Sequence, residues 1–505
     1  MRKNLLALSI AAMVGGLSGA ANAGVFDNNV AAGTTVPLAA PGAPADTLAP
    51  TVTGIGHILV VPYFTTQGTN ATLLNLVNTD ATNGKAVKLR FRGASNSDDV
   101  FDISIFLSPG DVWTANVSAS GELSALTTSD KSCTLPSAAA IVAAGGLFKT
   151  GRVQGGAAAQ TREGYIEILN MADIPPAATG LYPAIKHVNG VAPCTASTMD
   201  LQATDLQHAV AAHEPATRGY SWPTGGLMAN WTIVNLADKA SFSGEAVAIR
   251  ANVLATGASA PGNIVFFPQT ADAPLFTSGN PIANYNTVAE LTADPLLNAV
   301  PALVANYDFP DLSTPYTAAA TGAPGTQAGA LAAALQTTQI VNEFLTGTVA
   351  DFATDWVFSM PTRRYAVALN YGTTPATMIF NGAVAAHFTA ANTSLNPTTS
   401  QACVLPGGVL RSYDHEENTN STFVISPDAA LRFCGETSVL SFNSATGSQV
   451  LGAKLATSNI SAGYASGWMR INTGGLGAGL PIVGYAAAKA KGVNLGGTWV
   501  HRTAR

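Results

Sequence analysis

Three β-rich runs stand close together in residues 57–92, which read HILVVPYFTTQGTNATLLNLVNTDATNGKAVKLRFR. The first two runs, residues 57–64 and 71–78, are apolar and separated by a turn that contains Gly68. The third, residues 86–92, alternates apolar and basic side chains, which is the period of a β-strand. Short strands separated by turn residues predict an antiparallel arrangement.

Two further strands are expected at residues 102–107 and 112–117, on either side of the turn Pro109-Gly110. Strands this short, with turn signals between them, are typical of β-sandwiches. The sequence therefore predicts a mainly β fold of two immunoglobulin-like antiparallel β-sandwich domains, with a few short helices and long loops. The domains are expected at residues 54–265 and 266–505.

A weak internal repeat favours this organisation. Residues 74–78 (LNLVN) and 86–90 (AVKLR) are echoed by residues 231–235 (WTIVN) and 246–250 (AVAIR), as if one strand pair were used twice. A similar strand at residues 355–360 is expected to pair with residues 365–369.

One amphipathic helix is predicted in the second domain, over residues 328–345. Its apolar residues Leu331, Leu335, Val341 and Leu345 recur at near-helical spacing, with alanine between them. A shorter helix is expected at residues 137–142.

The N-terminus has the features of a secretory signal peptide over residues 1–23. Arg2 and Lys3 precede an apolar run at residues 5–14, and Ala21-Asn22-Ala23 supplies a small-x-small cleavage site. Residues 24–53, rich in Ala, Pro, Thr and Gly, are expected to form a flexible leader. The rest of the chain has no apolar stretch of membrane-spanning length. These features predict a secreted protein, extracellular or on the surface of a Gram-negative bacterium.

The chain is poor in charge. Charged residues make up 11% of it, against roughly 25% in ordinary soluble domains, and the formal net charge is −6. Nucleic acid is not expected as a partner because Lys and Arg form no basic stripe. A weakly repelling surface suits a protein that packs against copies of itself, although Thr, Ser and Asn could equally replace charge on a soluble secreted protein.

Four cysteines, Cys133, Cys194, Cys403 and Cys434, fall two in each half of the chain. Export delivers them to an oxidising compartment, so disulfides are expected. Of the three connectivities, we favour the local one, which joins Cys133 to Cys194 and Cys403 to Cys434. Zinc binding is disfavoured because neither CxxC nor a Cys/His ligand spacing occurs.

No catalytic motif stands out. Residues 463–467 read GYASG rather than GxSxG, and His213-Glu214 lacks the second histidine of HExxH. The chain is therefore expected not to be an enzyme and to hold no cofactor.

Two acidic clusters raise the alternative of a calcium site. Asp414, Glu416 and Glu417 form one, and Asp98, Asp99 and Asp102 form the other. Neither has the spacing of a calcium-binding loop, so a solvated turn is the favoured interpretation for both, with calcium as the alternative.

Four tryptophans are expected to anchor the core because each lies within an apolar strand pattern: Trp113, Trp231, Trp356 and Trp468. A role in stacking against a ligand is the minority interpretation.

Several motifs together resemble an exported proteobacterial family of cell-surface, surface-layer-like proteins. The first set comprises residues 54–56 (GIG), 62–65 (PYFT), 87–92 (VKLRFR) and 106–114 (FLSPGDVWT). The second comprises residues 341–344 (VNEF), 354–357 (TDWV), 360–362 (MPT), 413–417 (YDHEE) and 501–505 (HRTAR). The resemblance implies a surface location and assigns no catalytic residues.

These observations predict a non-enzymatic structural protein, a self-assembling subunit of a surface layer, sheath or matrix whose main partner is itself. The alternative is an adhesin or glycan-binding surface protein that uses loops on a β-sandwich, with envelope polysaccharide as its partner. A secreted hydrolase is a third, less favoured class.

Overall fold

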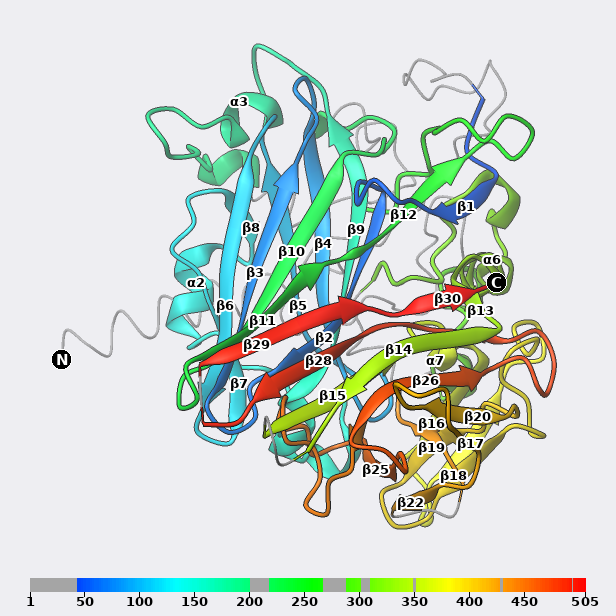
Figure 1. Cartoon of the computed structure of the whole chain (residues 1–505). Helices are drawn as coiled ribbons and strands as arrows, with labels where there is room; N and C mark the ends of the chain where they lie inside the picture. Colours follow the sequence, from blue (N-terminus) through cyan, green and yellow to red (C-terminus); the bar gives the residue numbers. More distant parts are fainter. Residues whose placement is uncertain are drawn as a thin grey trace.

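The structure is a computed structural model that describes residues 43–199, 218–266, 288–300, 309–347, 351–426, 430–492 and 494–505. The expected signal peptide, residues 1–23, lies outside these residues, as does the expected leader up to residue 42. The described chain is mainly β, built from several antiparallel sheets that pack face to face (Figure 1). This agrees with the mainly β, sandwich-like fold predicted from the sequence.

The first half of the chain forms two sheets. A seven-stranded sheet has the order β1-β12-β2-β9-β4-β5-β8, with bounds Thr47–Pro50 (β1), Ile58–Thr65 (β2), Gly84–Gly93 (β4), Asp99–Leu107 (β5), Cys133–Leu135 (β8), Glu163–Ile174 (β9) and Val247–Asn252 (β12). A five-stranded sheet has the order β11-β10-β3-β6-β7, with bounds Asn70–Asn78 (β3), Val112–Ser120 (β6), Leu123–Thr127 (β7), Leu227–Asn235 (β10) and Ala240–Glu245 (β11).

The second half forms two more large sheets. The six-stranded sheet has the order β22-β25-β24-β15-β28-β29, with bounds Phe352–Ser359 (β15), Val424–Ser426 (β22), Thr437–Phe442 (β24), Thr457–Ser461 (β25), Val483–Ala490 (β28) and Leu495–Val500 (β29). Its pair β24–β25 is parallel. The five-stranded sheet has the order β21-β20-β26-β14-β30, with bounds Gln339–Leu345 (β14), Leu410–Tyr413 (β20), Thr419–Asn420 (β21), Ser466–Asn472 (β26) and Arg502–Ala504 (β30).

Small sheets and short helices complete the fold. The small sheets pair β13 (Gln336–Thr337) with β27 (Leu480–Pro481), β16 (Val367–Asn370) with β17 (Thr377–Phe380), and β19 (Gln401–Val404) with β18 (Thr393–Asn396) and β23 (Phe433–Cys434). The α-helices are α2 (Ala138–Ala143), α3 (Leu181–Ile185), α5 (Pro295–Ala299), α6 (Pro324–Leu335) and α7 (Arg363–Ala366). Single 3-10 turns lie at Gln154–Gly156, Ala158–Thr161, Val288–Glu290 and Ala318–Ala320.

The two halves share their hydrophobic core. One buried cluster joins Val61 of β2 and Trp113 of β6 to Val357 of β15. In the same cluster the rings of Trp231 and Tyr485, one from each half, lie 4.6 Å apart. Because the core is continuous, the central strands of the seven-stranded sheet are buried on both faces: every residue of β2, β4 and β9 is buried.

The helix expected over residues 328–345 is shorter than predicted. Helix α6 begins at Pro324 and ends at Leu335, and strands β13 and β14 follow it. Along β14 buried Ile340, Asn342 and Phe344 alternate with more exposed neighbours. This two-residue period, with β-branched side chains, places Val341 and Leu345 on a sheet and not on a helix face.

The expected leader also ends earlier than predicted, because Thr47–Pro50 forms β1 and pairs with β12. A proline is tolerated there since β1 is an edge strand, which needs hydrogen bonds on one side only. The expected pairing of residues 355–360 with 365–369 is wrong as well. β15 pairs with β24 and β28, while residues 363–366 form helix α7.

The internal repeat has a different structural meaning from the one expected. β3 and β4 do not pair with each other, since β3 belongs to the five-stranded sheet of the first half and β4 to the seven-stranded one. Their counterparts β10 and β12 are divided between the same two sheets, and β3 pairs directly with β10. The repeated unit is therefore a strand of one sheet followed by a strand of the facing sheet.

Candidate functional site

The described residues hold an unusual concentration of buried charge, which we call the ionic layer. It comprises Lys85, Lys88, Arg90, Arg92, Asp98, Asp99, Asp102, Glu167, Asp173, Asp294, Arg363, Arg364 and Glu436. Its basic members in the first half all come from β4. Lys88, Arg90 and Arg92 alternate there with apolar Val87, Leu89 and Phe91, and Lys85 lies near the start of the strand. The alternation predicted from the sequence is present, but the basic face is buried and not solvated.

Carboxylates on the neighbouring strands β5 and β9 neutralise the basic face of β4. Lys85 Nζ lies 2.8 Å from Asp173 Oδ1, and Lys88 Nζ lies 2.6 Å from Asp102 Oδ1. Arg92 Nε lies 3.2 Å from Glu167 Oε2. Buried charges persist only when they are paired in this way, because leaving one unpaired in the interior costs several kcal/mol.

The second half of the chain closes the ionic layer with two consecutive arginines on α7. Arg363 Nε lies 2.8 Å from Glu436 Oε2, and both side chains are fully buried. Arg364 bridges the halves, since its Nε donates to Asp294 Oδ2 at 2.8 Å and its Nη1 donates to Asp98 Oδ1 at 3.0 Å. The layer therefore fixes the 94–99 connection of the first half onto the second half.

The carboxylates of the layer respond to two opposing effects. Burial raises the pKa of Asp98 and Glu436, and the neighbouring Arg364 and Arg363 only partly offset it. Burial also raises the pKa of Glu167, opposed by Arg92. At Asp102 burial acts in the same direction, but Lys88, Arg90 and Arg152 outweigh it and hold the pKa well below its usual range. Neighbouring cations that oppose the effect of burial on carboxylates are typical of structural ion pairs.

The first acidic cluster of the sequence therefore has neither of its expected roles. Asp98, Asp99 and Asp102 are buried and paired with cations, so they form neither a solvated turn nor a calcium site. Sequence reasoning missed Arg363, Arg364 and Glu436 altogether. The one signal that could have revealed them is the basic pair within the otherwise apolar stretch MPTRRYAVAL, residues 360–369.

The second acidic cluster forms an exposed turn between β20 and β21. The carboxylate of Asp414 accepts hydrogen bonds from the backbone N–H of Glu416 (3.0 Å) and Asn418 (2.8 Å) and from the amide of Asn418 (2.8 Å). These bonds, first that of the Asn418 amide, lower the pKa of Asp414. Within the described residues no group of three His, Cys, Asp or Glu side chains could hold a metal ion, so Asp414, Glu416 and Glu417 do not converge on one.

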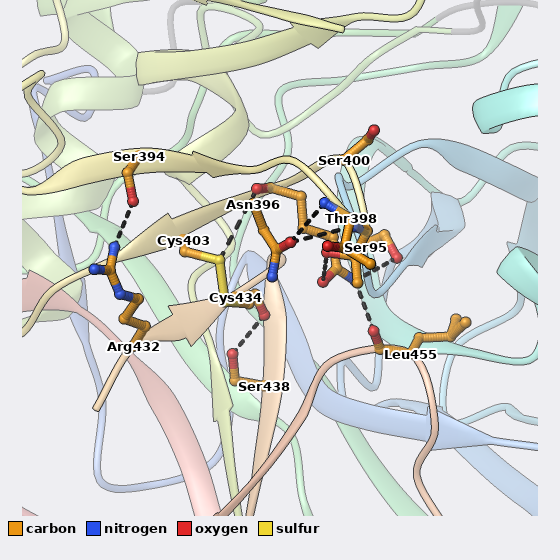
Figure 2. Close-up of a disulfide and its surroundings, with 12 residues drawn as sticks. Ser95, Ser394, Asn396, Thr398, Ser400, Cys403, Arg432, Cys434, Ser438 and Leu455 are labelled. Carbon is orange, nitrogen blue, oxygen red and sulfur yellow. Dashed lines mark hydrogen bonds between the residues drawn. A yellow bond between two sulfur atoms is a disulfide. The ribbon is translucent and has the colours of Figure 1, made fainter. Parts of the chain in front are cut away.

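The cysteines form the two disulfides expected from the sequence, Cys133–Cys194 and Cys403–Cys434. Cys403 and Cys434 are directly opposite each other on β19 and β23, with their Cα atoms 3.9 Å apart (Figure 2). Beside this disulfide lies a depression of about 230 Å³ that includes Gln401, Arg432 and Ser438 in its lining. It is smaller than ordinary small-molecule sites, which occupy roughly 300–1,000 Å³.

Three of the four tryptophans are buried, namely Trp113, Trp231 and Trp356. Trp356 contacts Phe442, and its indole N–H donates to the Glu343 carbonyl oxygen at 3.0 Å. Trp468 is not a core residue, because it projects from the outer face of β26, where it is partly exposed. There it stacks on Tyr413 of β20, with ring centroids 4.0 Å apart.

A buried histidine lies next to Trp356. Asn342 accepts the Glu343 N–H through its Oδ1 at 2.9 Å, so its amide N–H groups face His501 and reach Nδ1 at 3.0 Å. His501 Nε2 lies 2.9 Å from the Val357 carbonyl oxygen. This arrangement selects the neutral tautomer that carries its proton on Nε2. Burial lowers the pKa of His501 to about 3.

His501 should make the fold sensitive to acid. The unfolded chain protonates a histidine near pH 6.5, whereas the folded chain does so only near pH 3. The contribution of His501 is therefore complete above pH 6.5 and falls by about 1.4 kcal/mol per pH unit below it. In urea titrations between pH 7.5 and 4.5, the free energy of unfolding should fall more steeply for the native chain than for His501→Gln. Parallel curves would show that His501 titrates normally.

The fold and its charged interior define a mainly β, disulfide-containing protein stabilised by a buried ionic layer. None of its described helices is both long and apolar enough to cross a membrane. Comparisons with models of protein families, with curated proteins and with solved structures find no match for this chain.

Proposed function

We propose that this chain is a non-enzymatic, secreted structural protein of the cell surface that assembles with copies of itself. The low charge content of 11% supports the proposal, because such a surface offers little like-charge repulsion between copies. The two disulfides suit an oxidising location outside the cytoplasm. The described scaffold is mainly β and sandwich-like, and its division into two immunoglobulin-like domains stays a prediction.

The observation that carries the proposal is the set of exposed apolar side chains at the C-terminal edge strands, β29 and β30. β29 is the last strand of the six-stranded sheet and β30 the last of the five-stranded sheet, with β14 as its partner strand. Leu495, Trp499 and Val500 expose 59%, 48% and 70% of their surface. β29, which reads LGGTWV, has neither the charges nor the proline that usually protect a sheet edge. β11 lies beside it, where Thr498 Oγ1 donates to the Ser243 carbonyl oxygen, yet these three apolar side chains stay exposed (Figure 1).

These exposed apolar side chains can bind a second copy of the chain through apolar contact. We expect the purified protein to form ordered sheets or filaments by electron microscopy and to elute as large species in size-exclusion chromatography. Trp499→Lys with Val500→Lys should convert these species to monomer, because two lysines at the edge repel their counterparts on an approaching copy.

A matched control separates the loss of assembly caused by lysines at the edge from the effect of added charge in general. Val52 and Leu254 are exposed apolar residues on turns outside the β29–β30 edge, and Val52→Lys with Leu254→Lys adds the same charge. This control should still assemble. A native chain that stays monomeric at high concentration, or equal loss of assembly in both double variants, would contradict the proposal.

A further inference from the structure

The outer face of the sheet β21-β20-β26-β14-β30 carries a second feature that assembly does not explain. Figure 1 shows β20, β26 and β14 side by side in the second half, and their register places residues in rows across the strands. The inner face of this sheet packs on the core through residues such as Phe344, Met469 and Ile471. The outer face is exposed or partly exposed.

One row of this face contains two aromatic rings. Tyr413 and Trp468 are direct cross-strand partners, and their rings are parallel within 8°. Both remain partly exposed. Large aromatic side chains at a surface offer apolar area at low conformational cost, and the C–H face of a sugar ring packs against such area.

The adjacent row contains three arginines, which we call the arginine row: Arg411, Arg470 and Arg502. Arg411 is directly opposite Arg470, and Val341 lies between Arg470 and Arg502. The row crosses four strands, or about 14 Å at the usual spacing of neighbouring strands. It sits two residues along β20 and β26 from the aromatic pair, on the same face.

The arginine row should lower the stability of the sheet unless an anion binds to it. Like charges directly opposite each other on a sheet destabilise it. Arg502 has Glu343 at 4.0 Å, but the side chains of Arg411 and Arg470 make no hydrogen bond or ion pair with any part of the chain that the structure describes. In a chain with only 24 lysines and arginines among 505 residues, the opposed pair points to an external ligand. The guanidinium fork matches a carboxylate, which it can hold through two parallel hydrogen bonds.

We propose that this face binds a polysaccharide whose sugars carry carboxylate groups. Arg411 and Arg470 hold the carboxylates, and the Tyr413–Trp468 pair packs against a sugar ring. The acidic turn at Asp414, beyond the aromatic pair, repels such a polymer, so the polymer runs across the strands along the arginine row. A nucleic acid is less favoured because three arginines on a chain of net charge −6 do not make an extended basic track.

Binding of polygalacturonate, a polymer of carboxylate-bearing sugars, tests the proposal by calorimetry on the full chain. The native protein should bind it, bind its neutral methyl ester more weakly, and lose affinity as salt rises. Arg411→Gln with Arg470→Gln should weaken binding about tenfold or more, as expected for the loss of charge-assisted hydrogen bonds. Trp468→Ala should weaken binding of both polymers.

The control removes two exposed cations elsewhere, Lys131→Gln with Lys149→Gln, and should bind as the native protein does. If the double arginine variant fails to fold, Arg411→Gln alone gives the same test at an exposed side chain. Absence of binding, equal losses in both double variants, tighter binding of an oligothymidylate, or a changed oligomeric state on loss of the arginines would each overturn the proposal. Binding does not depend on assembly, so Trp499→Lys with Val500→Lys should retain it even if the proposed self-assembly is wrong.

Discussion

Replacing Arg363 by methionine should lower the free energy of unfolding by about 3–5 kcal/mol, the usual cost of breaking a buried ion pair. The Glu436 carboxyl group would then be left fully buried without the cation that opposes its raised pKa, with the Arg364 backbone N–H as a donor at 3.0 Å. Urea denaturation at pH 7.5 with the disulfides intact measures the loss.

The double variant Arg363→Met with Glu436→Gln supplies the decisive comparison. Glutamine can still accept from the Arg364 N–H without bringing a buried charge, so the double variant should be more stable than Arg363→Met alone. If the single variant costs less than about 1 kcal/mol, or if the two changes simply add, this part of the ionic layer does not behave as a buried pair.

Truncation of Trp356 to alanine should cost about 3–5 kcal/mol, because it opens a cavity in the core that both halves share. The indole contacts Phe442 and His501 and donates to the Glu343 carbonyl oxygen, and all of these contacts are lost. We expect a lower melting temperature and a lower yield of folded protein.

Trp468→Ala is the matched control, since it removes the same side chain from the outer face of a sheet. Its cost should be about 0.5–1.5 kcal/mol, the value of an aromatic pair, because solvent replaces the lost ring. Equal destabilisation by the two substitutions would contradict the distinction between core and surface that the structure draws.

The strands of the first half were predictable because their signal is local. The two-residue period of residues 86–92, and the apolar runs before it, are set by neighbouring side chains and by the turns between them. The boundary between α6 and β14 was not predictable from spacing. Leu331, Leu335, Val341 and Leu345 satisfy a helical period, and only pairing of residues 339–345 with β26 and β30 selects the strand.

Two of the tryptophans illustrate the same limit. Trp356 and Trp468 lie in similar apolar runs, so their sequence contexts predict the same burial. Trp356 is buried because β15 lies within the shared core, whereas no part of the chain that the structure describes covers Trp468 on the outer face of β26. The Tyr413–Trp468 pair joins residues 55 positions apart in the sequence through register alone.

The sequence by itself determined the β character of the chain, the alternation of β4 and the local pairing of the cysteines, since each depends on residue period or on proximity along the chain. Only the tertiary structure decided which faces of the strands point to the interior and which point to solvent. The sequence pattern of alternating apolar and basic residues is the same whether the basic side chains face water or buried carboxylates. The acid that meets Arg92 is Glu167 on β9, and the cation that meets Asp98 is Arg364 on α7. Both are brought there by a fold that buries both faces of β4.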